Sequence, residues 1–520
     1  MSGDLPHAGR MALMAAAVAA LVTGCAMPRQ LGSVFDPAAF TEAAPDEPAG
    51  APPAPPRPPP VPASPFAVAG PLVAHLPLTF EPGESWEAAG PLWYEQRAEE
   101  WRLRGLPPLW SRFDEPDTEH ADVYALPPLF SHHRYGEDRT WQVLQLIRHV
   151  HQVGVDDVVT DRFLVFPFIF WQDSTGPGRD YRAFLPFAGR VQGRFFRDEW
   201  SFILFPLYLQ TRKRDVITDN FVAPIVHVRR GDGLHGWQVW PLVGHEVKEA
   251  TSRTNLLGET TTVPGHDKFN LLWPVYWRHD LNRGSDQERR IRGVLPLWWS
   301  DRAPNRDHTA VLWPFFSWTD NREEGWRQLN LPFPIYARAR GEGKRLDRFW
   351  PFYSYGEKEG FESGLYFWPL YRWRKLETEN FTSERRTVAI VLYRDITQTQ
   401  RAPGTTRRVR ASWPFFFQED EPDGRRRLQV PALFEPLHDG RGVRRNWSPL
   451  WSLYRREENA ADQAASESLL WNLWREDTRG EVTRGSLLFG LVQYQAAPDS
   501  RRWRLFGLGP RWQPAPPDAP

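Results

Sequence analysis

The stretches VLWPFFSWTD at 311–320, RFWPFYSYGE at 348–357 and LYFWPLYRWR at 365–374 decide the fold of this 520-residue chain. Each is a short apolar and aromatic cluster built around a proline, and such clusters return about every 19 residues from Pro107 to Phe506. A fixed period of this length indicates a repeat protein, in which each unit completes its core only against its neighbours. We therefore interpret the chain as an array of about 22 units.

The clusters are rich in β-branched and aromatic residues and are bounded by turn sequences. Such turn sequences include TGPG at 175–178, GDG at 231–233 and GEGK at 341–344. Allowing about five residues for a turn leaves roughly 14 for a strand, and short turns force antiparallel pairing. The fold class predicted is all-β: an antiparallel meander of about 22 strands, closed or curled into a barrel-like shell. A layered, sandwich-like β repeat and a propeller are the alternatives.

Both faces of such a strand are apolar near its middle. Around Pro351, one face carries Phe349 and Tyr353, and the other carries Trp350 and Phe352. A sheet with two apolar faces needs cover on both sides, so we expect these side chains to be covered by protein, lipid or ligand. Because proline lacks an N–H for the strand ladder, we also expect a crease or bulge at the proline line. A sharp crease divides each unit into two short strands that lie in different sheets.

Composition limits the class of protein. Hydrophobic residues make up 41% and aromatic residues 14%, which is ample for a folded body. Lys plus Arg equals Asp plus Glu at 64 each, so no net charge attracts the chain to nucleic acid or to an anionic membrane, and we expect no nucleic-acid partner. The proline- and alanine-rich segment 43–65 predicts an extended, semi-rigid spacer.

The N-terminus carries a separate signal. Arg10 precedes an apolar run from Met11 to Val22, and Thr23, Gly24 and Cys25 follow at once. This run is too short to span a bilayer but has the length of a signal-peptide core. The segment resembles a bacterial lipoprotein signal, a resemblance that covers only the first 25 to 30 residues; the body resembles no family that we recognise.

The lipoprotein resemblance implies cleavage between Gly24 and Cys25 and lipid attachment to Cys25. Cys25 is the only cysteine, so no disulfide can form within the chain. Ala26 follows it where an aspartate would favour retention in the inner membrane. We therefore expect a lipid anchor in the bacterial outer membrane, with the body in the periplasm or at the cell surface.

These observations predict five segments. They are a signal peptide at 1–24, a lipid anchor and linker at 25–65, a transitional segment at 66–105, a β-repeat domain at 106–510 and a disordered tail at 511–520. Within the transitional segment, a short helix is one possibility for 94–104.

The last units, SPLWSLYRRE at 448–457, SLLWNLWRED at 468–477 and SLLFGLVQYQ at 486–495, lose the central proline. Terminal repeats meet a different neighbour from internal ones. We expect these units to form a C-terminal cap, or a seam that closes onto the first strands.

No motif predicts catalysis. Gly231 to Gly236 has the glycine spacing of a dinucleotide site, but a strand follows it instead of the helix that such a site needs, so we interpret it as a turn. His132, His133, His149 and His151 lie close in sequence but without the spacing of metal ligands. We predict no catalytic residue, no metal site, no cofactor and no enzymatic activity.

The function predicted is an outer-membrane-anchored lipoprotein that displays a β-repeat shell, as a non-catalytic envelope scaffold or binding module. Its partners are the membrane, through the N-terminal lipid, and an apolar ligand or an envelope glycan. The alternatives are an integral β-barrel or a carrier for an apolar molecule such as lipid, and a glycan-acting enzyme. The sequence names no ligand-binding residue and no oligomeric state.

Overall fold

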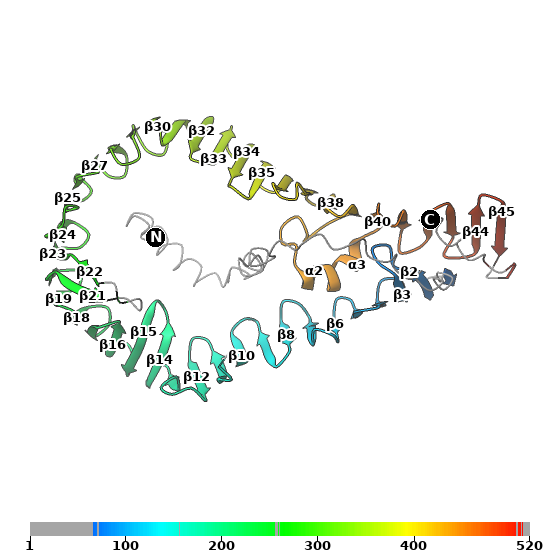
Figure 1. Ribbon diagram of the computed structural model, residues 1–520, viewed down its shortest axis with the longest axis horizontal. Helices are drawn as coiled ribbons and strands as arrows, with labels where there is room; N and C mark the ends of the chain where they lie inside the picture. The colour runs from blue at the N-terminus through cyan, green and yellow to red at the C-terminus, as the bar shows by residue number, and fades with distance from the viewer. Residues whose placement is uncertain are drawn as a thin grey trace, which may run out of the picture. The chain divides into compact units, whose positions relative to one another are not determined.

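The computed structural model describes residues 66–69, 72–154, 156–254, 258, 260–505, 508–510 and 512. These residues belong to a single compact unit. Among them, 43 strands form one antiparallel sheet, and a separate hairpin forms a second sheet. Strands that are consecutive in the chain pair with each other, so the sheet is an up-and-down meander (Figure 1). The all-β class and the antiparallel meander predicted from the sequence are confirmed.

The strands of the first half of the sheet are β1 Ala67–Ala69, β2 Val73–Pro77, β3 Gly83–Ala88, β4 Trp93–Ala98, β5 Arg102–Leu106, β6 Trp110–Glu115, β7 His120–Ala125, β8 Phe130–Tyr135, β9 Asp138–Val143, β10 Ile147–Val153 and β11 Val159–Val165. They continue with β12 Ile169–Ser174, β13 Tyr181–Phe184, β14 Ala188–Arg194, β15 Arg197–Ile203, β16 Tyr208–Lys213, β17 Val216–Phe221, β18 Val226–Gly231, β19 Leu234–Val239 and β20 Val243–Lys248. The separate hairpin is β21 Thr251–Thr254 and β22 Thr260–Val263.

The second half of the sheet contains β23 Gly265–Leu271, β24 Tyr276–Arg283, β25 Arg289–Val294, β26 Trp298–Ala303, β27 Arg306–Val311, β28 Phe316–Asn321, β29 Trp326–Asn330, β30 Tyr336–Gly341, β31 Lys344–Phe349, β32 Tyr353–Lys358, β33 Phe361–Tyr366 and β34 Tyr371–Glu377. It ends with β35 Phe381–Val388, β36 Tyr393–Gln400, β37 Thr406–Ser412, β38 Phe416–Asp420, β39 Arg425–Val430, β40 Tyr454–Asn459, β41 Ala464–Leu469, β42 Trp474–Arg479, β43 Val482–Leu487, β44 Val492–Ala497 and β45 Ser500–Leu505. Two short helices, α2 Arg441–Asn446 and α3 Ser448–Trp451, lie between β39 and β40.

Each period of the sequence makes two short strands, so the predicted count of about 22 strands is wrong. Between β27 and β28, the chain turns at 312–315, where the N–H of Phe315 donates to the carbonyl of Leu312 at 3.0 Å. The peptide bond before Pro314 is cis, at the third position of this turn, as in type VI turns. Proline therefore lies outside the strand ladder, where its missing N–H costs no ladder bond. The two strands pair directly in one sheet, Val311 with Phe316, and not in two different sheets.

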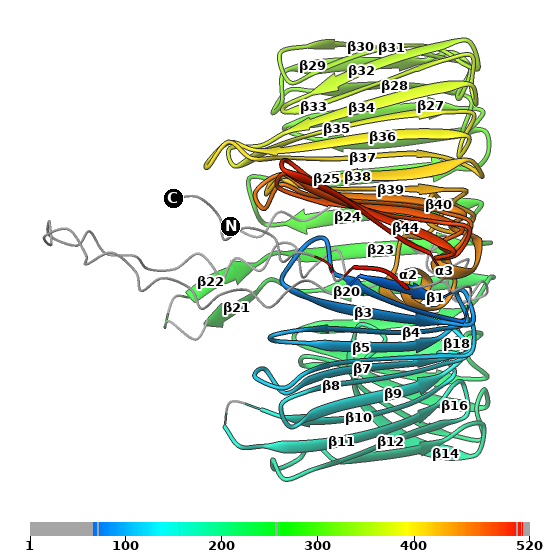
Figure 2. The same ribbon diagram turned by 90° about the vertical axis from the view of Figure 1, so that its right-hand side faces the viewer.

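Successive turns alternate between the two edges of the sheet, because each strand runs antiparallel to the last. Apolar turns built around proline, such as 312–315, collect at one edge, which we call the apolar edge. Most turns at the other edge, the polar edge, are charged or glycine-containing, such as 322–325 and 342–343, whereas the turn 195–196 consists of two phenylalanines. In Figure 2 the strands run side by side between these edges, and the β21–β22 hairpin projects beyond the polar edge.

The sheet is not closed into a barrel by strand pairing. Instead, it curls until its first and last strands pack face to face (Figure 1). The side-chain amide of Gln493 donates to the carbonyl of Val68 at 2.7 Å, and that of Asn459 donates to the carbonyl of Phe80 at 3.0 Å. The final units thus meet the first strands, as the sequence predicted for a seam, but through side chains. We call the face on which the two ends meet the inner face.

The helical insertion fills the space between the two ends beside this seam. Asn446 of α2 donates to the hydroxyl of Ser111 at 2.8 Å, and the indole of Trp447 donates to the carbonyl of Pro127 at 3.2 Å. The hydroxyl of Tyr94 donates to the carbonyl of Arg445 at 2.7 Å. In Figure 1 both helices lie inside the curl of the sheet. The insertion therefore connects strands that are more than 300 positions apart in the chain.

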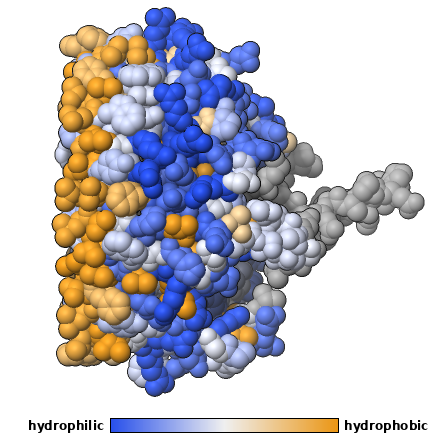
Figure 3. Space-filling view, turned by 90° about the vertical axis from the view of Figure 1, so that its left-hand side faces the viewer, coloured by the Kyte–Doolittle hydropathy of each residue, from blue (hydrophilic) through white to orange (hydrophobic). Residues whose placement is uncertain are grey.

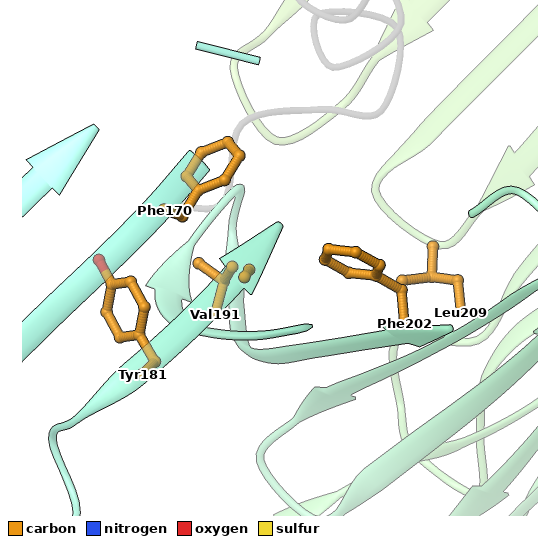
Figure 4. Close-up of a cluster of buried hydrophobic side chains, with 6 residues drawn as sticks. Phe170, Tyr181, Val191, Phe202 and Leu209 are labelled. Atoms are coloured by element: carbon orange, nitrogen blue, oxygen red, sulfur yellow. The ribbon is translucent and has the colours of Figure 1, made fainter. Parts of the chain in front are cut away.

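The largest apolar core cluster lies on β12 to β16. It consists of Phe170, Tyr181, Ala183, Val191, Phe202 and Leu209 (Figure 4). The register between neighbouring strands places these side chains on the inner face. The aromatic residues next to the prolines, in contrast, lie in the turns and not at mid-strand. The expectation that both faces are apolar and covered at mid-strand is therefore wrong.

The segment 66–105 belongs to the sheet, because it forms strands β1 to β5. The stretch 94–104, for which a short helix was one expectation, lies within β4, β5 and the turn between them. At the other end, Trp512 packs edge-to-face on Phe66 with ring centroids 6.3 Å apart, and its indole donates to the Phe66 carbonyl at 3.0 Å. Trp512, the second residue of the predicted 511–520 tail, thus contacts the residue that precedes β1.

Candidate functional site

The apolar edge is the most distinctive surface of the described residues. Its turns contain leucine, phenylalanine, tryptophan, valine and proline almost without interruption. They are 107–109, 126–129, 144–146, 166–168, 185–187, 204–207, 222–225, 240–242, 272–275, 295–297, 312–315, 331–335, 350–352, 367–370, 389–392, 413–415, 470–473 and 488–491.

The strand residues next to these turns extend the apolar edge by one row on the face opposite to the inner face, which we call the outer face. Cross-strand pairing makes the row continuous. From β17 to β28 it reads Phe221, Val226, Val239, Val243, Leu271, Tyr276, Val294, Trp298, Val311 and Phe316.

These apolar side chains are exposed. The exposed fraction is 47% for Trp313, 51% for Trp368 and 61% for Phe415. In Figure 3 the hydrophobic residues form a layer along one edge of the molecule, and hydrophilic residues cover most of the face behind it. An apolar surface that is continuous over so many strands marks an interaction with another protein, a ligand or a membrane.

The apolar edge is thin compared with the length of the strands. A turn and one strand residue on either side of it reach about 7 to 10 Å along the strand direction, at roughly 3.3 Å per residue. Beyond that depth the outer face carries ion pairs, such as Arg190 with Glu199 at 2.8 Å and Arg230 with Asp219 at 3.1 Å. The surface therefore changes within a few residues of each turn from continuously apolar to mixed, with ion pairs between separate aromatic side chains such as Trp237 and Trp318.

A cavity of about 300 Å³ at the seam is the second candidate. Arginine is the commonest residue in its lining, and each arginine there is paired with a carboxylate. The pairs are Arg427 with Glu457 at 3.3 Å, Arg441 with Asp122 at 3.2 Å, Arg444 with Glu419 at 2.9 Å, Arg445 with Asp122 at 3.3 Å and Arg455 with Glu87 at 3.2 Å.

The carboxylates at the seam are held in their charged form. Burial acts to raise the pKa of Asp122, but a hydrogen bond from His133 and the charges of Arg445 and His120 keep that pKa well below its usual range. In the same way, Arg455 and Arg475 outweigh burial and lower the pKa of Glu87. The ion pairs neutralise Asp122, Glu87 and the arginines of the cavity within the protein, and they hold the two ends of the sheet together. Glu435 also lines the cavity, where its buried carboxylate accepts hydrogen bonds from Gln429, Ser448 and Trp451.

The histidines considered from the sequence do not form one cluster. The register places His132, His149 and His151 on the outer face and His133 on the inner face. The ring of His133 contacts Asp122 at 2.7 Å, and that of His151 contacts Asp161 at 2.8 Å. Within the described residues, no group of three histidine, cysteine, aspartate or glutamate side chains could hold a metal ion.

Within the glycine-rich segment from Gly231 to Gly236, residues 232–233 form the tight turn between β18 and β19, and the flanking residues belong to these strands, so the interpretation of this segment as a turn is confirmed. Gly24 and Cys25, the predicted cleavage and lipid-attachment residues, lie outside the described residues. None of the helices in the described part of the chain has both the length and the apolar character needed to cross a bilayer.

The sequence pattern identified the residues of the apolar edge, but we expected them at mid-strand and they lie in turns. The prolines could have indicated this, because proline is at the centre of most clusters and is excluded from the middle of a sheet.

Taken together, fold and site define a repetitive all-β meander protein with one apolar edge. No family model matches the chain, and no curated protein sequence matches it.

Proposed function

We propose that the protein is a non-catalytic lipoprotein of the bacterial outer membrane that rests its apolar edge in one leaflet of a lipid bilayer. The observation that carries this proposal is the apolar edge itself, in which successive turns place exposed tryptophan, phenylalanine and leucine side chains along one side of a single sheet. The lipoprotein-like N-terminus, with Cys25 as the anchor, supports the same location.

The depth of the apolar edge fits a bilayer surface. Segments that lie in a membrane interface bury their apolar side about 5 to 10 Å deep, which is close to the depth of this edge. Tryptophan and tyrosine prefer the boundary between acyl chains and headgroups; tryptophan recurs in the turns, and tyrosine recurs in the first row of the outer face. The ion pairs beyond that row would stay in water.

The free energy gained by burying the apolar edge in lipid is ample for membrane binding. Moving one exposed leucine, phenylalanine or tryptophan side chain into the acyl layer contributes on the order of 1 kcal/mol, so ten of them contribute on the order of 10 kcal/mol. The strands are mostly six or seven residues long, shorter than the roughly 9 to 11 residues of a membrane-spanning strand. These lengths favour a protein that sits on one leaflet over one that spans the bilayer.

As a scaffold, the body would stand on the membrane with its polar edge pointing away from it. The β21–β22 hairpin, which extends beyond that polar edge, would then be the part of the described chain farthest from the lipid.

The test is flotation of the full chain with neutral phosphatidylcholine vesicles. The chain carries Cys25→Ala, so that binding through an acyl anchor cannot conceal the contribution of the apolar edge. We expect the protein to float with the vesicles. The triple variant Trp273→Gln, Trp313→Gln, Trp368→Gln, on the apolar edge, should bind roughly a hundredfold more weakly, at about 1 kcal/mol per side chain.

The matched control is Trp171→Gln, Trp237→Gln, Trp318→Gln. These tryptophans lie on the outer face away from the edge, with exposed fractions of 43%, 48% and 49%. The control should bind vesicles like the parent. Absence of flotation by the parent, or equal loss in both triple variants, would contradict the proposal.

A further inference from the structure

The inner face of β31 to β36 carries arginines and no carboxylate. Cross-strand pairing aligns Arg348, Ser354, Leu365, Arg372, Thr387 and Arg394 in one row. The next row, one step farther from the apolar edge, pairs Arg374 with Arg385. We call Arg348, Arg372, Arg374, Arg385 and Arg394 the arginine patch.

The register fixes the face on which the arginine patch lies. Arg394 aligns through Ala411, Phe417 and Gln429 with Arg455. Arg455 contacts Glu87 across the seam, so this row belongs to the inner face.

The carboxylates of the same strands lie on the outer face. Glu357, Glu362, Lys375 and Glu384 align with one another in a row that alternates with the arginine rows. Within the described residues, no ion pair joins Arg372, Arg374, Arg385 or Arg394 to a carboxylate, in contrast to the paired arginines of the seam. Partial burial, and then the charges of Arg394 and Arg374, lower the pKa of Arg385. A neighbouring anion would relieve this repulsion.

The arginine patch also has a defined height above the apolar edge. Arg348, Arg372 and Arg394 are each one residue inside the end of a strand, next to Phe349, Tyr371 and Tyr393 of the apolar edge. One residue along a strand is about 3.3 Å, and the headgroup layer of a bilayer is about 5 to 8 Å thick. With the apolar edge in the acyl layer, the guanidinium groups lie at the level of the phosphates.

We propose that the arginine patch binds the headgroups of anionic phospholipids, so that the protein prefers anionic over neutral membranes. This inference rests on the proposed function, because the seating of the apolar edge sets the height of the patch. Guanidinium groups pair with phosphate oxygens through two parallel hydrogen bonds, and the patch offers several such groups on one face.

The experiment compares the full chain carrying Cys25→Ala on vesicles of pure phosphatidylcholine and on vesicles in which about a third of the lipid is phosphatidylglycerol. The parent should bind the anionic vesicles more tightly, and about 0.5 M salt should remove the difference. The variant Arg372→Gln, Arg374→Gln, Arg385→Gln should lose about fivefold of the anionic preference per arginine and keep its binding to neutral vesicles.

The control variant, Arg338→Gln, Arg345→Gln, Arg386→Gln, changes net charge by the same amount on the outer face. It should retain the anionic preference. Equal binding of the parent to both kinds of vesicle, or equal losses in the two variants, would overturn this inference while leaving the seating of the apolar edge intact.

Two further outcomes separate this inference from the proposed function. A parent that binds anionic vesicles only would support the arginine patch and contradict the seating of the apolar edge. Binding of inorganic phosphate without vesicles, lost in the patch variant alone, would assign the patch to a soluble anion and overturn its assignment to lipid.

Discussion

The carboxylate of Glu87 on β3 accepts a hydrogen bond at 3.2 Å from the guanidinium of Arg455 on β40, 368 positions farther along the chain. The side chain of Asn472 donates to the other oxygen of the same carboxylate at 2.6 Å. Glu87 thus connects β3 to β40 and to the turn between β41 and β42. Since β1 and β45 do not pair, contacts of this kind hold the curl together.

Glu87→Gln should weaken the seam. The carboxylate is only 14% exposed, and removing its charge leaves Arg455 without a charged partner, at a cost of about 2 to 4 kcal/mol. The change should appear as faster hydrogen exchange in β1–β3 and β40–β45, with less change in β23–β28 on the far side of the curl. The control is Glu359→Gln in an exposed turn at the polar edge.

The stability of the seam should depend on pH. The folded-state pKa of Glu87 is lowered, so its contribution to stability is present above the ordinary glutamate pKa of about 4.3 and is lost as pH falls through the folded value. Glu87→Gln should therefore reduce the loss of seam protection below about pH 4. Equal acid sensitivity in the parent and the variant would contradict the role given to Glu87.

The sequence predicted the all-β class and the antiparallel meander, and it gave the contact of the last units with the first strands as one of two possibilities, the other being a C-terminal cap. It did not predict two strands per period, because the cluster around Pro314 has the composition of a strand but forms a turn. Aromatic residues favour strands when one side is covered, and here they are exposed. A segment that contacts an apolar environment outside the protein has the same apolar composition as a segment buried in the protein core, so composition does not distinguish the two.

The seam and the arginine patch were beyond the reach of sequence reasoning for a different reason. Asn446 contacts Ser111, and Glu87 contacts Arg455, because the twist and register of every strand between them together determine the curvature of the sheet. The local sequence pattern does not specify that curvature. The arginine patch depends on the same registers, since a shift by one residue would place Arg372 on the outer face.

Gly293→Ala should destabilise the sheet. The indole ring of Trp277 on β24 lies directly over Gly293 on β25, so that a Cβ atom there would overlap Nε1 of the ring. The ring also stacks on Trp299 with centroids 6.1 Å apart, which leaves it little freedom to move. We expect a loss of about 1 to 3 kcal/mol, measured as a lower urea midpoint.

Gly154→Ala is the matched control for Gly293→Ala. Its added Cβ would meet its nearest neighbour, the carbonyl oxygen of Val158, at 3.5 Å, an ordinary contact. Its urea midpoint should stay close to that of the parent. If Gly293→Ala unfolds at the same midpoint as the control, the packing of Trp277 on the glycine contributes nothing to stability.

His308 should make stability depend on pH in a higher range than the carboxylates do. Burial, and then the charge of Arg306, lower its pKa to about 4, although Asp301 acts in the opposite direction. The unfolded chain takes up this proton near pH 6.5, so the full contribution of neutral His308 is present above about pH 6.5 and is lost as pH falls towards 4. The variant His308→Gln removes this titration. It keeps a polar partner for the hydroxyl of Thr319, which contacts Nδ1 of His308 at 2.7 Å in the parent.

Between pH 6.5 and 4, the free energy of unfolding should fall less steeply with pH in His308→Gln than in the parent, by up to about 1.4 kcal/mol per pH unit. Urea denaturation at several pH values measures this slope, and substitution of the exposed His235 by Gln is the control; equal slopes in the parent and His308→Gln would refute the prediction.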